Sequence, residues 1–320
     1  MRARLIAFIV TPAREGSTAG NRVTALRWAK RLRELGWTVR IDRAWSGEPC
    51  DLLVALHAHK SHASIARHAI ERPAGPRVVA LTGTDLYGDL DHDELARESL
   101  ELATRLVVLQ SRGIDRVPPH LRDRARVIVQ SASAPASASP QPPLTACALA
   151  HLRDVKDPLL AARAATLLPA TSRWRLLHLG DAPDDTWRER TRQAERGARG
   201  RWSWLGARPR GEALQILAGC AALVVASRSE GGANVVTEAI AAHVPVLSTR
   251  IEGSLGILGA DYPGYFEVGD AAGLARLLER CETDAGFFAN LRDRIGALSA
   301  LVEPARERES WRSLLDELAG

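Results

Sequence analysis

The sequence lacks several features that would assign it to a specialised class of protein. Its four cysteines form no CxxC pair and no cysteine–histidine set with the spacing of metal ligands, so neither a disulfide framework nor a zinc site is expected. No apolar run approaches membrane-spanning length, and the run at residues 5–10 is too short for the core of a signal peptide. We therefore expect a cytoplasmic protein with no membrane partner.

Lysine is also scarce. Only Lys30, Lys60 and Lys156 are lysines among 43 basic residues, and the rest are arginines. They are interspersed with 38 acidic residues, so the net charge of +5 does not indicate a nucleic-acid partner. The small excess favours an anionic ligand over a cationic one. The length of 320 residues and the apolar content of 46% suit two ordinary globular domains.

The first half alternates short apolar runs with helical patterns. The runs predict buried strands at residues 5–10, 37–41, 51–57, 77–83, 105–110 and 126–131. Strands that are apolar along their whole length are typical of a parallel sheet covered on both faces. Between the first two, Val23, Leu26 and Leu35 recur at helical spacing, and Gly36 is expected to end that helix. Residues 1–130 are thus predicted to form a Rossmann-like domain.

Residues 131–143 are rich in Ser, Ala and Pro and form a linker by composition. After this segment the alternation of short apolar runs and helical patterns resumes. Further strands are predicted at residues 145–152, 174–180, 201–206, 221–227 and 245–249. Residues 144–303 would form a second Rossmann-like domain, and a helix at 304–320 would pack back on the first. The fold class is α/β, with two doubly wound domains facing a central cleft.

Ligands of open α/β sheets bind beyond the carboxyl ends of the strands, so the loops that follow strands hold the candidate residues. After the first strand, Gly20 and Asn21 lead into a helix whose free amides suit an anion, with Arg22 and Thr24 nearby. A plain glycine-bearing turn is an equal alternative. The segment does not fit the dinucleotide-binding pattern GxGxxG.

Three histidines follow the third strand: His57, His59 and His62. No carboxylate or cysteine completes a metal-binding set with them, so no metal site is predicted. We expect Ser61 to cap the next helix and His57, with Lys60 nearby, to face the ligand.

The loop after the fourth strand offers Thr82, Gly83, Thr84 and Asp85. An acidic run follows it, with aspartates at 89, 91 and 93, similar to a metal-binding DxD. Its position at a helix start makes helix capping the preferred interpretation.

In the second half, Arg153 and Lys156 precede a helix expected near Pro158, where two cations suit a diphosphate. A surface pair is the alternative. Leu205, Gly206 and Arg208 lie in a later loop that could hold a base through backbone contacts.

Two glutamates then stand eight residues apart. Glu230 precedes Gly231 and Gly232, which let the backbone approach a ligand, and Glu238 lies within an apolar helix. A carboxylate that serves packing alone is not expected there.

The Glu230-x7-Glu238 pattern, preceded by the Arg153-x-x-Lys156 loop, resembles retaining glycosyltransferases of the GT-B fold, family 4. That resemblance implies that Glu230 contacts the transferred sugar and that Glu238 holds the ribose of the nucleotide. It assigns the diphosphate to Arg153 and Lys156. The donor-binding amides it implies are those of Gly231, Gly232, Ala233, Asn234 and Val235.

Several segments, including GSTAGNRVTALRWA, DLLVALHAHKSHAS and SRSEGGANVVTEAI, resemble a narrower family, the selenosugar synthases of selenoneine biosynthesis. These enzymes are understood to transfer N-acetylglucosamine or a related hexose from a UDP-sugar donor to selenophosphate, forming a C–Se bond. The resemblance implies that Glu230, Lys156, Arg153 and His57 are catalytic and that no cofactor is required. The acceptor would bind to Gly20, Asn21, Arg22, Thr24, Lys60, Thr82, Gly83 and Thr84.

Three other functions fit parts of the sequence. A related glycosyltransferase could use a hydroxyl or thiol acceptor, and a nucleotide-sugar-binding protein could lack turnover. Two Rossmann-like halves also suit an NAD(P)-dependent oxidoreductase, although the glycine pattern for that cofactor is missing. The oligomeric state stays open.

Overall fold

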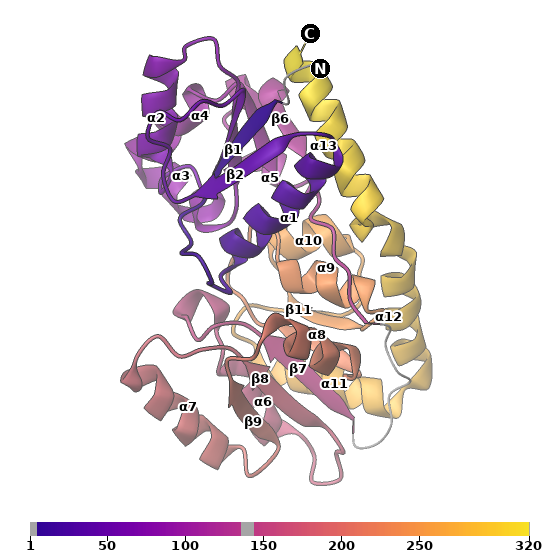
Figure 1. The fold of residues 1–320 in the computed structure, drawn as a ribbon. Helices are drawn as coiled ribbons and strands as arrows, with labels where there is room; N and C mark the ends of the chain where they lie inside the picture. Colours follow the sequence, from indigo (N-terminus) through magenta and orange to yellow (C-terminus); the bar gives the residue numbers. More distant parts are fainter. Residues whose placement is uncertain (1–4, 136–143, 320) are drawn as a thin grey trace. The chain divides into compact units, whose positions relative to one another are not determined.

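The computed structural model describes residues 5–135 and 144–319 (Figure 1). The chain divides into two compact units. The first comprises Met1–Ser131, Glu230–Gly232 and Pro304–Gly320, and the second comprises Ala132–Ser229 and Ala233–Glu303. Of the predicted linker, residues 136–143 lie outside the described part of the chain.

The first unit is built on a parallel sheet in the order β2-β1-β3-β4-β5-β6. The strands are β1 (Ile6–Val10), β2 (Thr38–Asp42), β3 (Leu52–Leu56), β4 (Arg77–Leu81), β5 (Arg105–Val108) and β6 (Ala125–Val127). The helices are α1 (Gly20–Glu34), α2 (His62–Glu71), α3 (Leu90–His92), α4 (Glu94–Glu101), α5 (Gly113–Arg116) and α13 (Pro304–Ala319). A π-helical turn (Asp85–Asp89) and a 3₁₀ turn (Pro119–Arg124) complete the unit.

All six strands predicted for the first half are present. Most are shorter than predicted, whereas β2 is shifted by one residue and β6 begins one residue earlier. All five residues of β3 are buried, as expected for a central parallel strand with helices on both faces. The helix end at Gly36 is also confirmed. Its φ is +92° and its amide donates to the carbonyl of Arg33, a conformation that glycine adopts without steric cost.

The second unit repeats the architecture with a parallel sheet in the order β12-β11-β10-β7-β8-β9. Its strands are β7 (Thr145–Leu149), β8 (Arg175–Leu179), β9 (Trp202–Gly206), β10 (Ala222–Val225), β11 (Val246–Thr249) and β12 (Tyr265–Phe266). Its helices are α6 (Leu160–Leu167), α7 (Asp185–Gly197), α8 (Arg210–Ala218), α9 (Asn234–Ala241), α10 (Glu252–Leu258), α11 (Ala271–Thr283) and α12 (Ala285–Ala297). Two 3₁₀ turns are η3 (Asp154–Lys156) and η4 (Ser299–Val302).

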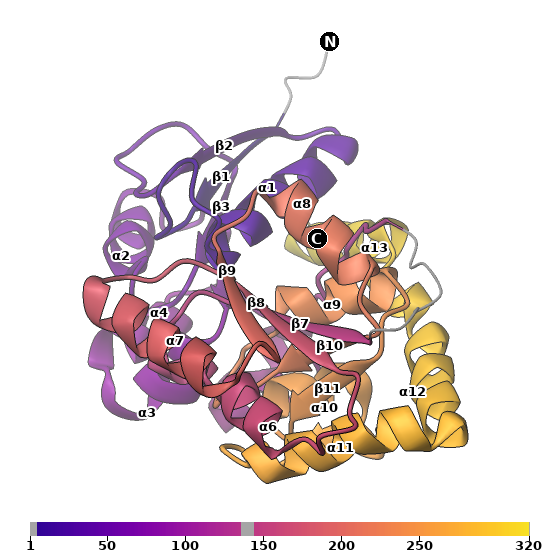
Figure 2. The same ribbon diagram turned by 90° about the horizontal axis from the view of Figure 1, so that it is seen from below.

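The neighbouring strands β9, β8, β7 and β10 lie side by side in Figure 2. Helices α6 and α11 of the same unit contact each other. The α/β class with two parallel sheets is therefore confirmed. The short edge strand β12 was not predicted, because two residues carry no readable periodicity.

Helix α13 belongs to the first unit and runs beside α1 (Figure 1). The ring of Trp311 is buried and packs edge-on against Trp28 at 5.0 Å between centroids. Below them the buried carboxylate of Glu307 accepts hydrogen bonds from Trp28 Nε1 at 3.0 Å and Ser131 Oγ at 2.5 Å. A buried charge needs such partners, so α13 is fixed by polar as well as apolar contacts.

All four cysteines are buried and none forms a disulfide. This confirms the core positions predicted for Cys50, Cys147 and Cys220. Within residues 5–135 and 144–319, no helix is both long and apolar enough to cross a bilayer.

Candidate functional site

Each sheet has one place where the strand order reverses, and the predicted residues gather beside these places. In the first unit the reversal lies between β1 and β3, and in the second between β7 and β10. The loop after β3 carries His57, whereas the loops after β7 and β10 carry Lys156 and Glu230. Open α/β sheets bind ligands at such reversal points.

His57 is the most constrained residue of the first unit. It is buried and has a φ of +78°, a conformation that costs a non-glycine residue about 1–2 kcal/mol. The Lys60 amide donates to its Nδ1 at 3.4 Å, and its Nε2 lies 3.0 Å from Thr84 Oγ1. Because Nδ1 accepts, the ring proton is assigned to Nε2, which donates to Thr84.

Burial lowers the pKa of His57, and the nearby Lys60 acts in the same direction, while Asp85 at 4.0 Å opposes them. The imidazole is therefore neutral near pH 7. In that state it supplies no positive charge, and both of its ring nitrogens are hydrogen-bonded within the first unit.

Asp85, which the sequence offered beside Thr82–Thr84 without a defined role, organises the loops around His57. Its carboxylate is fully buried and accepts from the amides of Ala58 at 3.1 Å, Thr82 at 2.9 Å and Gly83 at 2.7 Å. It therefore joins the ends of β3 and β4, and the predicted residues of these two loops lie together. The signal available in the sequence was an acid directly after the Thr82–Thr84 loop.

The predicted anion turn before α1 is only partly suited to its role. Gly20 and Asn21 begin the helix, and Arg22 lies near them with Glu15 at 4.0 Å from its guanidinium. Thr24, however, is buried, and its hydroxyl donates to the Gly20 carbonyl and accepts from Gln130. The hydroxyl of Thr24 therefore points into the unit, so its assignment to the acceptor pocket is corrected.

Two local predictions after β3 and β4 also need correction. Ser61 occupies the N-cap position of α2, but its hydroxyl donates to the Leu56 carbonyl at 2.7 Å and caps no helix amide. Among the three aspartates, only Asp93 caps a helix, accepting from the Ala96 amide. Asp91 pairs with Arg116 at 2.7 Å, and Asp89 lies 3.8 Å from His57 Nε2.

In the second unit, Arg153 and Lys156 lie on the 3₁₀ turn η3, and the Lys156 amide donates to the Arg153 carbonyl at 2.9 Å. The helix expected near Pro158 begins at Leu160. His151, which the sequence analysis did not select, lies just before them, and its Nδ1 accepts from the Asp181 amide at 3.1 Å. Burial lowers the pKa of His151, and Arg153 and Lys156 act in the same direction, so it is neutral.

Glu238 lies on α9 and is buried, as the apolar context of its helix predicted. Its Oε1 is 2.5 Å from the guanidinium of Arg210, at the start of α8. The exposed fraction of the Glu238 side chain is 5%, whereas that of Arg210 is 44%. Arg210 was missed because the contact joins residues that are distant in the sequence and have no common motif.

The segment proposed for a base forms the end of β9. Gly206, with a φ of +72°, accepts from the Gly180 amide at 3.0 Å, so the strand end is held against the loop after β8. Arg208 pairs with Glu212 at 3.1 Å on α8. The backbone around Leu205 is thus fixed by its neighbours.

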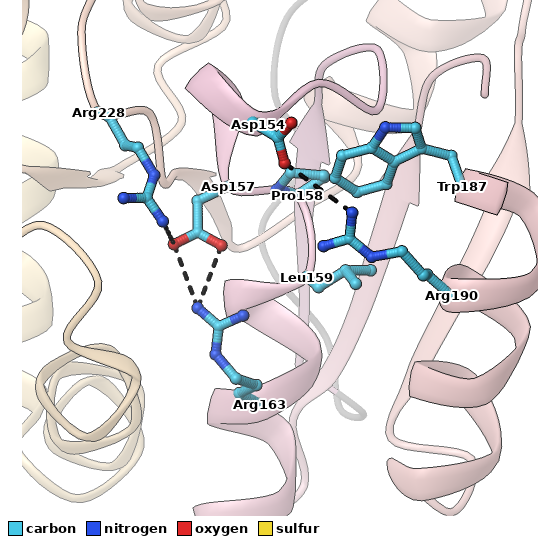
Figure 3. A pocket seen from close by; sticks show the side chains of 8 residues that line it. All are labelled: Asp154, Asp157, Pro158, Leu159, Arg163, Trp187, Arg190 and Arg228. Carbon is cyan, nitrogen blue, oxygen red and sulfur yellow. Dashed lines mark hydrogen bonds and ion pairs between the residues drawn. The ribbon is translucent and has the colours of Figure 1, made fainter. Parts of the chain in front are cut away.

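A cavity of about 280 Å³ lies beside η3 within the second unit (Figure 3). Its wall contains three arginines, two aspartates and an indole: Arg163, Arg190, Arg228, Asp154, Asp157 and Trp187. Arg190 stacks on the ring of Trp187 at 4.0 Å. No group of three or more His, Cys, Asp or Glu side chains within the described residues could hold a metal ion.

Comparison with known proteins identifies the family. The family model of the group 1 glycosyl transferases matches residues 129–298, more than half of the chain. No curated protein sequence matches the chain.

Solved structures with the same fold are similar over almost the whole length. Anabaena HepE in complex with UDP and glucose has a TM-score of 0.78 at 15% identity, covering 98% of this chain and 100% of its own. Sucrose-phosphate synthase from Thermosynechococcus elongatus has a TM-score of 0.78 at 14% identity, with 99% of each chain covered. A glycosyltransferase from Rickettsia africae has a TM-score of 0.76 at 13% identity, again with 99% of each covered.

These similarities and the two parallel six-stranded sheets give the chain the GT-B fold. The chain belongs to the group 1 glycosyl transferases.

Proposed function

We propose that this glycosyltransferase takes its sugar from a UDP-sugar and transfers it to selenophosphate, giving a selenosugar. The observation that carries the donor half is the buried carboxylate of Glu238, in the same unit as the cationic turn Arg153–Lys156. A ribose diol requires a hydrogen-bond acceptor, which the Glu238 carboxylate offers. A diphosphate requires positive charge, which Arg153 and Lys156 offer. Support comes from HepE, which has been solved in complex with UDP-glucose.

The donor roles follow from this arrangement. Glu238 accepts from the ribose hydroxyls once Arg210 releases it, and the backbone at Leu205, Gly206 and Arg208 borders the base. Glu230 contacts the hydroxyls of the sugar. The amides at residues 231–235 lie at the start of α9, where the helix dipole favours phosphate and sugar oxygens.

Transfer breaks the bond between the anomeric carbon and the diphosphate oxygen, and UDP leaves with that electron pair. Arg153 and Lys156 stabilise the negative charge that grows on UDP. A selenium lone pair forms the new C–Se bond, and the phosphoryl group stays on selenium in this step. Because selenophosphate is already an anion, no general base is required. The proposed reaction needs no cofactor, so we expect a chelator such as EDTA to leave the rate unchanged.

The acceptor groups belong to the first unit. Neutral His57 and its partner Thr84, with Lys60, Thr82 and Gly83, offer a lysine, hydroxyls and amides to a small anion. Gly20, Asn21 and Arg22 at the start of α1 offer a second set of donors. The resemblance of these loops to the selenosugar synthases supports selenophosphate as the acceptor.

Mass spectrometry of the products tests both halves. UDP-N-acetylglucosamine and UDP-glucose are each incubated with selenophosphate, phosphate, a hydroxyl acceptor, a thiol acceptor or no acceptor. We expect UDP release and a selenium-containing sugar only with selenophosphate. UDP release with a hydroxyl or thiol acceptor, and none with selenophosphate, would keep the donor assignment and reject the acceptor.

A further inference from the structure

The residue that follows Lys156 has an unusual backbone. Asp157 has φ +38° and ψ +57°, the left-handed region, which costs a non-glycine residue about 1–2 kcal/mol and which Asp and Asn tolerate best. Its side chain is only 8% exposed. Because the conformation is unfavourable, contacts of the carboxylate must hold it in place.

Two arginines from different parts of the second unit converge on that carboxylate (Figure 3). Arg163 on α6 donates from Nη2 to both carboxylate oxygens at 3.1 Å. Arg228, in the loop after β10, brings its Nη2 to 3.6 Å from Oδ2. A charge that is removed from water in this way needs such partners, and Asp157 has one from each side.

Arg228 also contacts the turn on the other side of Lys156. Its amide donates to the Val155 carbonyl at 2.8 Å. Arg228 therefore contacts both neighbours of Lys156. Its main-chain amide donates to Val155, and its guanidinium pairs with Asp157. Lys156 lies between these two attachments. Arg228 is also only two residues before Glu230, so it joins the segment that carries the glutamate to the turn that carries the lysine.

We propose that Asp157 and Arg228 form a positioning pair that sets the Lys156 ammonium for the terminal phosphate of the UDP group. The pair does not itself touch the substrate. This inference rests on the proposed function, because it assumes that Lys156 binds the diphosphate. Groups that orient a functional side chain affect activity although they do not contact the substrate themselves.

The test uses the full chain with three changes: Asp157→Asn, which keeps the tolerance for the left-handed backbone and removes the charge, Arg228→Gln, and both together. Calorimetry with UDP and UMP is combined with kcat and KM for the UDP-sugar. We expect each single change to weaken UDP binding and lower kcat/KM about tenfold, the scale seen for orienting partners. Binding of UMP, which lacks the terminal phosphate, should stay within about twofold of the wild type, because the pair acts on Lys156 alone.

The double variant should be no worse than Asp157→Asn alone, since the side chain of Arg228 acts through Asp157, which Arg163 also holds. Arg192→Gln is the matched control. Its side chain is 59% exposed, as is that of Arg228, but it pairs with Glu189 on the same helix α7, so UDP binding should stay unchanged.

Three results would overturn the inference. Equal losses of UDP and UMP affinity, or a lowered melting temperature with unchanged kcat/KM, would give the pair a structural role only. Additive losses would mean that the residues act separately. If Asp157→Asn does not fold, Arg228→Gln carries the test, because its side chain is 59% exposed. A wild type that binds no UDP would reject the proposed function together with the inference.

Discussion

The ion pair between Glu238 and Arg210 gives the sharpest test of the donor site. A hydrogen bond from a ribose hydroxyl to the carboxylate is worth about 1.5–3 kcal/mol. Glu238→Ala removes that acceptor, so UDP binding should weaken by about 10–150-fold. Because the carboxylate is buried, water has little access to it, so most of the free energy of the hydrogen bond with the ribose hydroxyl should appear in UDP binding.

Arg210→Ala should have the opposite effect. In the free protein its guanidinium lies 2.5 Å from the carboxylate, and ribose binding has to replace that contact. Since Arg210 is 44% exposed, the pair contributes up to about 1 kcal/mol. UDP should therefore bind up to about fivefold more tightly to this variant, and the gain should vanish when Glu238 is also removed.

Calorimetry with UDP and 2′-deoxy-UDP separates the ribose contact from other effects. The wild type should prefer UDP, whereas Glu238→Ala should bind the two ligands equally. Glu189→Ala removes an acid–arginine pair from the exposed surface of α7 and serves as the control. If Glu238→Ala bound UDP like the wild type, or kept its preference over the deoxy ligand, the ribose assignment would be wrong. Weaker binding to Arg210→Ala would show that Arg210 contributes to the site.

Three further outcomes are expected. Lys156→Ala should lose a charge-assisted contact of about 1.5–3 kcal/mol and lower kcat/KM for the UDP-sugar about 10–150-fold; steady-state kinetics with unchanged kcat/KM would refute the diphosphate role. Glu307→Ala breaks a buried polar network and should destabilise the first unit by about 3–5 kcal/mol in urea unfolding, while Glu307→Gln, which still accepts from Trp28, should lose less. Burial lowers the pKa of His178 to about 4, so protons favour the unfolded chain as pH falls below about 6.5. Stability should fall by up to about 1.4 kcal/mol per pH unit between pH 6.5 and 4, and His178→Gln should reduce that slope; an equal slope in both proteins would contradict the assignment.

Apart from the short edge strand β12, the strands of both sheets were predictable, because most buried parallel strands are apolar on both faces. β3 and β10, for example, appear in the sequence as uninterrupted apolar runs, and every residue of each is buried. The burial of Glu238 was predictable for the same reason, since its helical neighbours are apolar. Its role with ribose stays a prediction, as do the roles of Glu230 and Lys156.

Residues whose importance depends on contacts across the chain were not predictable. Arg210 acquires its partner Glu238 only when the chain folds, and no local motif marks it. Asp85 was offered by its place after the fourth strand, but its contacts with the amides of Ala58, Thr82 and Gly83 could not be read from the sequence. The left-handed backbone of Asp157 was not predicted from the sequence, because it depends on contacts of the carboxylate with Arg163 and Arg228. Thr24 was misassigned because a position beside a helix start does not fix which way a hydroxyl points.

Helix α13 also determines the order in which the two units can be completed during synthesis. The second unit has all its residues once Glu303 has left the ribosome, whereas the first unit still lacks Trp311 and Glu307. Domains usually mature on the ribosome from the amino terminus onward. Here the earlier half of the chain has to wait for α13, so its face beside Trp28 stays uncovered until that helix has been made.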